Sequence, residues 1–391
     1  MFLKFVSILD CHCKFKSINH NIIALAFTII LYLFSKFLPF FIFMIYFKSM
    51  GSVKDLEILQ KPSKSRMGIA RFHFSDRYSV FDWGKMPDEI PHKGEALCII
   101  GAYFFEILKD FGIQSHYVGL VEDGKVLELK DLKKPSAVME VKLTRVLRPL
   151  KDKKGNYLYS HFFSEKGNFL IPLEIIFRNS LPQNSSFVQR IKEGKIMLSD
   201  YGLTQIPPAE QILKTTIIDF STKLEPTDRY LKETEAYEIS GLNLNEFKEL
   251  KEKALNVNKI ITEKVKKLNL IHIDGKVEMA LDPKRNIILV DVFGTPDESR
   301  FFMDGFHLSK EIARIFYRKT DWFKEVILRK EENRNNWKEN VKSDPPSLPK
   351  NLLLGISNLY CSFCNELTSR EWFSDVPPLK EVLSELRSLV N

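Results

Sequence analysis

The segment of residues 271–300 constrains the fold of this chain more than any other. Two β-rich runs flank the turn Asp282-Pro-Lys-Arg-Asn286, a pattern that predicts a β-hairpin. A four-residue loop beginning at Pro283 would set Glu278 directly opposite Asp291. The register of this hairpin therefore decides which side chains meet.

In this register Asp282 pairs with Ile287, and side chains alternate between the two faces. One face is apolar and comprises Val277, Met279, Leu281, Ile288, Val290 and Val292. The other face carries Glu278 and Asp291, with Cβ atoms about 5 Å apart. Two carboxylates this close destabilise the strand pair unless a cation lies between them. Because hard oxygen ligands suit Mg²⁺, the sequence predicts a magnesium site.

The composition of residues 50–391 indicates a globular protein without a nucleic-acid partner. The whole chain is 44% hydrophobic and 28% charged. The 342 residues after position 49 contain 53 basic and 49 acidic side chains. This surplus is too small for a nucleic-acid surface, so small anionic substrates fit better.

The first 49 residues have a different character. They hold 10 of the 31 phenylalanines, five lysines and a single acidic residue, Asp10. Residues 22–47 are nearly all apolar and long enough to span a bilayer, so a membrane anchor, a cleaved signal peptide and an over-extended translation start compete. No small-residue cleavage site follows, and the composition is that of a translated AT-rich region. We therefore expect residues 1–45 to be an over-extended start, and no membrane partner unless residues 22–47 are a true anchor.

Hydrophobic periodicity predicts an alternation of strands and helices. The expected strands are 69–74, 138–147 and 169–177, with a polar hairpin at 151–156; the expected helices are 94–111, 243–268, 350–368 and one beginning near Phe187. Asn243 and Glu246 form a candidate capping box for the second of these helices. The cysteine pair Cys361 and Cys364 lacks the second ligand pair that a zinc site needs, so we expect both to pack inside a helix.

Six motifs along the chain resemble the SAICAR synthetase (phosphoribosylaminoimidazole-succinocarboxamide synthase) family, and they occur in the family's order over roughly residues 46–370. They are Gly51-Ser-Val-Lys54-Asp55; Ser75-Asp-Arg-Tyr-Ser-Val-Phe-Asp82; Ile90-Pro-His-Lys-Gly94; Pro172-Leu-Glu174 with Arg178-Asn179; Ser221-Thr-Lys223-Leu-Glu225-Pro-Thr-Asp228; and Asp274-x-Lys276-x-Glu278 with Asp291 and Thr295-Pro-Asp297-x-Ser-Arg300.

The resemblance implies an α+β fold of two lobes with antiparallel sheets and an ATP cleft between them, similar to ATP-grasp and kinase-like folds. It places an N-terminal lobe at residues 46–165, a central lobe at 166–306 and a helical C-terminal region at 307–391. It also implies a cytoplasmic enzyme. A monomer and a homo-oligomer stay open.

The implied reaction is the ATP-dependent joining of L-aspartate to carboxyaminoimidazole ribotide (CAIR) through an acyl phosphate, with ATP and Mg²⁺ as cofactors. The resemblance assigns ATP binding to Gly51, Lys54, Lys223, Glu174, Glu278 and Asp291. It assigns substrate binding to Asp82, Arg178, Ser186, Lys276 and Arg300, of which Lys276, Asp82 and Arg300 are the catalytic candidates. Glu278 and Asp291 are the metal ligands.

Two positions depart from the family pattern, and two further residue roles stay open. Ser52 stands where the family often has Lys, and Val292 where it commonly has Glu. A two-residue insertion lets either Ser185 or Ser186 take the substrate role. Lys276 would pair with carboxylates or bind a substrate carboxylate, and we favour the second.

Two other functional classes compete with the ligase. One is a kinase-like protein with another acceptor, and the other is a membrane-tethered, non-catalytic relative. Retention of Asp82, Arg178 and Arg300 argues against both, because a bare ATP site needs no substrate-binding residues.

Overall fold

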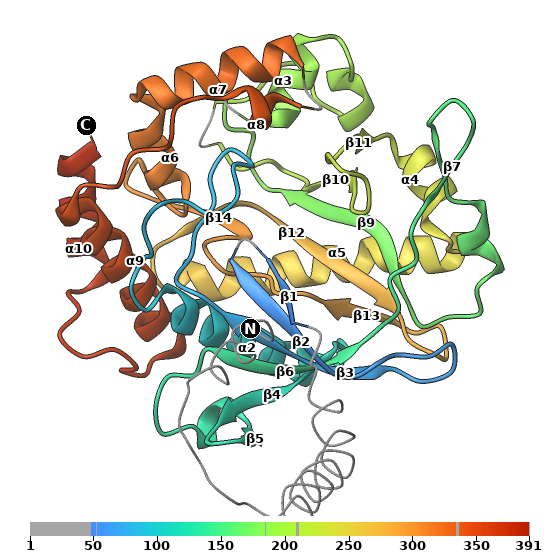
Figure 1. Ribbon diagram of the computed structural model, residues 1–391, viewed down its shortest axis with the longest axis horizontal. Coiled ribbons are helices and arrows are strands. Elements are labelled where there is room, and N and C mark those ends of the chain that lie inside the picture. The colour runs from blue at the N-terminus through green and yellow to red at the C-terminus, as the bar shows by residue number, and fades with distance from the viewer. Residues whose placement is uncertain (1–47, 52, 184, 209–210, 334–335, 391) are drawn as a thin grey trace, which may run out of the picture. The chain divides into compact units, whose positions relative to one another are not determined.

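The computed structural model describes residues 48–391 except 52, 184, 209–210, 334–335 and 391 (Figure 1). The predicted N-terminal extension, with its apolar segment 22–47, lies outside the described residues. Within the described part of the chain, no helix is both long and apolar enough to cross a membrane.

The first sheet is antiparallel, with strand order β1-β2-β3-β6-β4-β5. Its strands are β1 (Lys48–Met50), β2 (Lys54–Gln60), β3 (Gly68–Phe74), β4 (Tyr117–Glu122), β5 (Lys125–Leu127) and β6 (Val138–Leu143). Helix α2 (Lys93–Asp110) packs against β3, β4 and β6 through an apolar face that includes Ile99 and Phe105. The predicted strand at 138–147 is too long, because Arg145 leaves β6 and pairs with Phe169 at the start of β9.

The second sheet has the order β11-β10-β9-β12-β14-β15, and β13 pairs with β12. Its strands are β9 (Phe169–Arg178), β10 (Ile217–Thr222), β11 (Tyr230–Leu231), β12 (Ile271–Leu281), β13 (Ile287–Val290), β14 (Ser299–Met303) and β15 (Phe306–Leu308). Helix α5 (Leu244–Lys266) runs along β9 and β12 (Figure 1). It begins at the predicted capping box, in which Asn243 and Glu246 bond each other's backbone N–H.

Short elements connect the sheets to the helices. They are the hairpin β7 (Leu150–Lys151) and β8 (Tyr157–Leu158), helices α3 (Ser186–Lys192) and α4 (Glu233–Ser240), and 3₁₀ turns η3 (Leu129–Asp131), η4 (Ser160–Ser164) and η5 (Leu198–Tyr201). The hairpin and α3 lie where the sequence predicts them.

The hairpin between β12 and β13 corrects the predicted register. Leu281, not Asp282, pairs with Ile287, and Glu278 lies opposite Val290 rather than Asp291. The loop is one residue shorter than predicted, because the Asp282 N–H donates to the Asn286 carbonyl at 2.9 Å and so closes a three-residue turn. Ile288 and Val290 consequently lie on the face opposite to the one predicted.

An unusual residue makes this short turn possible. Arg285 adopts a left-handed φ of 67°, where glycine or asparagine is usual. Its guanidinium binds Glu246 at 2.7 Å and the carbonyl of Glu165 at 2.9 Å. These long-range contacts hold the strained backbone, and the local sequence pattern does not contain them.

The two sheets are joined by hydrogen bonds and by a common core. The segment before β4 bonds to β13, since His116 N–H donates to Leu289 at 2.9 Å and Leu289 N–H donates to Gln114 at 3.0 Å. One hydrophobic cluster contains side chains from both sheets, including Met139 of β6 and Val277 of β12. Residues 48–391 therefore form one compact unit, and the lobe boundaries at 165 and 306 stay predictions.

The C-terminal region is helical: α6 (Glu311–Arg318), α7 (Asp321–Glu332), α8 (Trp337–Asn340), α9 (Lys350–Thr368) and α10 (Leu379–Val390). Helix α9 has the predicted bounds and packs between α2 and α10. Cys361 and Cys364 are buried in it, and burial raises the pKa of both thiols. Both are therefore protonated packing residues, as predicted.

Candidate functional site

One face of the second sheet is charged because side chains alternate along its strands. Asp274, Lys276 and Glu278 occupy every second position of β12 and so share a face. The residues between them, such as Val277, join the core on the other face. Neighbouring strands add further charged residues to the same face, which divides into two clusters.

The ammonium cluster comprises Glu174, Lys223, Lys276 and Glu278. Glu278 of β12 lies opposite Glu174 of β9, so the like-charged pair on this sheet is Glu174 and Glu278. Lys223 Nζ lies 3.2 Å from Glu174 Oε1 and 2.6 Å from Glu278 Oε1, and Lys276 Nζ lies 2.7 Å from Glu174. Ammonium groups therefore lie between Glu174 and Glu278, a carboxylate pair other than the Glu278 and Asp291 pair to which the sequence assigned a metal.

The charges of this cluster reinforce one another. Burial opposes ionisation of Glu174, yet Lys276 and Lys223 hold the pKa of its carboxyl below the ordinary value. Burial likewise opposes the charge on Lys276, but Glu298, Glu174 and Glu278 raise the pKa of its ammonium group. Both lysines stay cationic at neutral pH, as a site for polyphosphate requires.

Lys54 and Asp291 approach the cluster from the first sheet and from the end of β13. Gly51 forms the turn before β2, where an added Cβ would lie 2.3 Å from the Lys54 carbonyl oxygen. Lys54 forms an ion pair with Asp291, whose φ of 61° is left-handed. Burial lowers the pKa of the Lys54 ammonium to about 8, although Glu298 and Glu278 act in the opposite direction. His116 Nε2 donates to the Asp291 carbonyl at 3.2 Å and fixes this turn.

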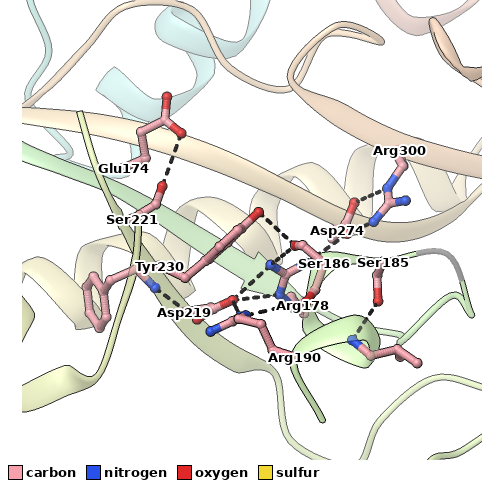
Figure 2. Close-up of polar contacts among 12 residues, drawn as sticks. Glu174, Arg178, Ser185, Ser186, Arg190, Asp219, Ser221, Tyr230, Asp274 and Arg300 are labelled. Carbon is pink, nitrogen blue, oxygen red and sulfur yellow. Dashed lines mark hydrogen bonds and ion pairs between the residues drawn. The ribbon is translucent and has the colours of Figure 1, made fainter. Parts of the chain in front are cut away.

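The arginine cluster comprises Arg178, Arg190, Asp219, Asp274 and Arg300 (Figure 2). Arg178 Nε and Nη2 donate to Asp219 Oδ2 at 3.1 and 2.8 Å, and its Nη1 lies 3.5 Å from Asp274. Arg300 forms a forked contact with Asp274, with Nε at 2.8 Å, and Arg190 also pairs with Asp219. Three guanidinium groups share two carboxylates, so the cluster carries a net positive charge suited to a phosphate.

The structure separates the roles of Ser185 and Ser186. Ser185 is the N-cap of α3, and its side chain accepts from the Val188 N–H at 3.3 Å. Ser186 Oγ lies 3.4 Å from Arg178 Nη2 and donates to the Tyr230 hydroxyl at 2.7 Å (Figure 2). Ser186 therefore belongs to the arginine cluster, whereas Ser185 stabilises the helix.

Asp82 lies apart from both clusters, in the wall of a cavity of about 860 Å³. The same cavity is lined by Asp228, by Lys151 of β7 and by Trp337 of α8. Burial and the nearby Glu174 raise the pKa of the Asp228 carboxyl, which also senses Lys276, Lys223 and Asp82. Asp228 is therefore close enough to sense the charges of both the ammonium cluster and Asp82.

Several charged residues of the site were not predicted. Arg190 follows Ser186 by four residues and reaches Asp219 from α3. Glu298 lies 3.5 Å from Lys276. Burial opposes ionisation of the Glu298 carboxyl, but this ammonium group holds its pKa below the ordinary value. Asp219 precedes Ser221, the first residue of the predicted motif, by two residues. It therefore lies on the same face of β10 as Ser221, and this spacing is the signal that could have predicted it.

The carboxylates suit a metal that is bound together with a nucleotide. Among residues 48–391 as described, no group of three or more histidine, cysteine, aspartate or glutamate side chains is arranged to hold a metal ion. Mg²⁺ usually takes only one or two protein carboxylates and completes its shell with phosphate and water. Glu278 and Asp291, both beside lysines, fit this mode rather than a cage made of protein ligands alone.

Comparison with known proteins points to one family. The family model described as SAICAR synthetase matches residues 58–340. An Archaeoglobus fulgidus protein, provisionally named phosphoribosylaminoimidazole-succinocarboxamide synthase, is 52% identical over 341 residues, covering 87% of this chain and 100% of its own. The Thermoplasma volcanium protein of that name is 33% identical over 308 residues, covering 77% of this chain and 93% of its own. Among solved structures, the SAICAR-synthase of Saccharomyces cerevisiae complexed with SAICAR aligns with a TM-score of 0.57 at 22% identity, covering 84% of this chain and 97% of that one.

Proposed function

This chain belongs to the SAICAR synthetase family, ATP-dependent ligases of purine biosynthesis, and we propose that its two charged clusters bind the two phosphorylated substrates of that reaction. The ammonium cluster, with Lys54, receives the ATP phosphates. The arginine cluster, with Ser186, receives the phosphate of the ribotide CAIR. L-Aspartate is the third substrate.

The order of residues along β12 supports this assignment best. Asp274 belongs to the arginine cluster, Glu278 belongs to the ammonium cluster, and Lys276 lies between them. A strand rises about 3.3 Å per residue, so Lys276 is about 7 Å along the strand from each of the other two. A ribotide held at one end and a triphosphate at the other would meet near the Lys276 ammonium.

The chemistry follows from this placement. The carboxylate of CAIR attacks the γ-phosphorus of ATP, ADP leaves, and an acyl phosphate forms. The amino group of L-aspartate then attacks the acyl carbon and loses a proton. The bond between this carbon and the bridging oxygen breaks, and phosphate leaves with that oxygen. Lys276 neutralises the carboxylate that approaches ATP, Lys54 and Lys223 neutralise the transferring phosphoryl group, and Asp82 contacts the ribotide.

The proposed magnesium site lies beside the lysines that receive the ATP phosphates. Glu278 and Asp291 would hold Mg²⁺ against the nucleotide. When bound, the ion neutralises phosphate charge during transfer. We place the reaction in the cytoplasm, in keeping with its ionic, phosphorylated substrates.

Isotope transfer tests this function directly. CAIR labelled with ¹⁸O in its carboxylate, incubated with L-aspartate and Mg-ATP, should give SAICAR, ADP and phosphate in equal amounts, with one label in the phosphate. Lys276→Met should stop this transfer, whereas the exposed Lys259→Met should not. ADP formation with an acceptor other than CAIR, or unlabelled phosphate, would favour the kinase-like alternative.

A further inference from the structure

The turn that carries Asp82 is strained. Phe81 and Asp82 have φ values of 54° and 62°, both left-handed. A single non-glycine residue in this region is uncommon, and among the described residues no other two adjacent non-glycine residues share it. Such conformations persist only where the surroundings enforce them, and they concentrate at functional sites.

Helix α7 of the C-terminal region supplies the contacts that hold this turn. Lys330 Nζ donates to the Phe81 carbonyl at 2.9 Å and to Asp82 Oδ2 at 3.0 Å. The Phe81 ring packs on Phe323 with 4.4 Å between centroids, and so it is anchored to the same helix. The Lys330 ammonium also lies 4.5 Å from the centroid of the Trp337 ring. Backbone, side chain and ring of the turn are thus all held from α7 and α8.

The same C-terminal segment helps to form the cavity beside Asp82. Trp337 and Lys338 of α8 line the cavity of about 860 Å³ together with Asp82. Asp82 is 88% exposed, so its ion pair with Lys330 contributes little to stability. The second bond of Lys330, to a main-chain carbonyl, does not neutralise any charge. Both facts favour orientation of Asp82, rather than stabilisation of the fold, as the role of Lys330.

We propose that Lys330 is a positioning residue for the ligase reaction: it holds the left-handed Phe81-Asp82 turn so that the Asp82 carboxylate faces the bound ribotide. This inference rests on the role proposed above for Asp82. The C-terminal helices then take part in substrate recognition indirectly, because the Lys330 ammonium acts through Asp82 and not through its own contact with substrate.

Lys330→Met tests the proposal, with Lys324→Met as the matched control. Lys324 lies on the same helix and forms an exposed ion pair with Asp321 at 2.7 Å. Lys330→Met should lower kcat/KM for CAIR about tenfold, the low end for loss of a charged hydrogen bond. The KM for ATP should change less than about twofold, and Lys324→Met should leave every parameter unchanged. Lys330→Arg, which keeps a cationic donor, should restore most of the loss.

A double-mutant cycle separates this inference from the role of Asp82. If Lys330 acts through Asp82, adding Lys330→Met to Asp82→Asn should cause no further loss in kcat/KM for CAIR. Additive losses, or equal losses for CAIR and ATP, would overturn the positioning role and leave Asp82 as a substrate residue. Should Lys330→Met prove poorly folded by circular dichroism, Lys330→Gln in the same cycle decides between these outcomes. Full activity of Asp82→Asn would overturn both assignments.

Discussion

Replacing the buried Lys93 should destabilise the fold in a way that depends on pH. Lys93 of α2 is fully buried, and its Nζ lies 2.7 Å from Asp297 Oδ2. Tyr360 of α9 donates to the other carboxylate oxygen at 2.6 Å. This triad ties α2 and α9 to the segment just before Arg300. Lys93→Met would leave the Asp297 carboxylate buried with one hydroxyl donor and without its closest cation.

The size of the effect follows from the pKa of Asp297. Burial acts to raise it, but Lys93 and Lys310 lower it from 3.8 to about 2. A depressed carboxyl pKa contributes stability above pH 3.8, here about 2 kcal/mol, and loses it as the pH falls through about 2. Removing one partner of a buried ion pair typically costs about 3–5 kcal/mol, because the other charge is left uncompensated. We expect a loss of about 3 kcal/mol at pH 7.

Urea denaturation followed by circular dichroism measures this loss. Without Lys93 the Asp297 carboxyl can take up a proton at a higher pH, so the gap between wild type and Lys93→Met should be smaller at pH 4.5 than at pH 7. Lys93→Met with Asp297→Asn should recover much of the stability, since neither charge is then buried. Lys109→Met, on the same helix but exposed, should change it by less than about 0.5 kcal/mol. Equal urea midpoints for wild type and Lys93→Met at pH 7 would refute the reasoning.

Three further predictions concern the site and the chain. Asp291→Asn or Glu278→Gln should abolish turnover at limiting magnesium without unfolding the protein, as activity against Mg²⁺ concentration and a urea midpoint would show; near-wild-type activity there would exclude the metal assignment. Arg300→Lys should reduce kcat/KM for CAIR by about 2–3 kcal/mol, because the forked contact is lost, while ATP affinity measured by calorimetry without CAIR stays the same. If ATP affinity falls instead, Arg300 belongs to the nucleotide site. A chain shortened to residues 46–391 should be soluble and fully active in the ligase assay, since every proposed site residue lies within it; dependence of activity on residues 22–47 would contradict this.

Local patterns predicted those elements whose type is recorded in their own residues. Helix α5 shows a clear apolar repeat and a capping box, and α9 has the predicted bounds. Strand β9 is apolar over nearly its whole length, and it was predicted to within one residue. A periodic pattern identifies the two helices, whereas a continuous apolar run identifies β9.

The register of the hairpin between β12 and β13 could not be predicted in the same way. The turn is one residue shorter than its sequence suggests because Arg285 adopts a left-handed backbone conformation. Contacts with Glu246, 39 residues away, stabilise this conformation. Because of this difference of one residue, the sequence predicts Asp291 as the partner of Glu278, whereas the structure has Val290 there.

The residues of the candidate site were easier to predict than their partners. Family motifs supplied Arg178, Ser186 and Arg300, which the fold brings together. The carboxylate partner of Arg178, Asp219, comes from another strand, and the third guanidinium, that of Arg190, comes from a short helix. Their meeting depends on packing between elements, and no spacing along the chain records it.

The alternation along β12 also limits how this protein can vary. Insertion of one residue between Asp274 and Glu278 would turn one of these carboxylates into the apolar core and bring a core side chain to the substrate face. Insertion of two residues would restore the faces but move the clusters apart by about 7 Å, beyond the reach of one ribotide and one triphosphate. The turn at residues 153–156 of the β7–β8 hairpin is exposed and lies beyond Lys151 and Tyr157, which line the cavity, so it carries no such restriction. Relatives of this ligase should therefore differ in the length of the β7–β8 turn. In β12 they should differ by substitutions, without insertions or deletions.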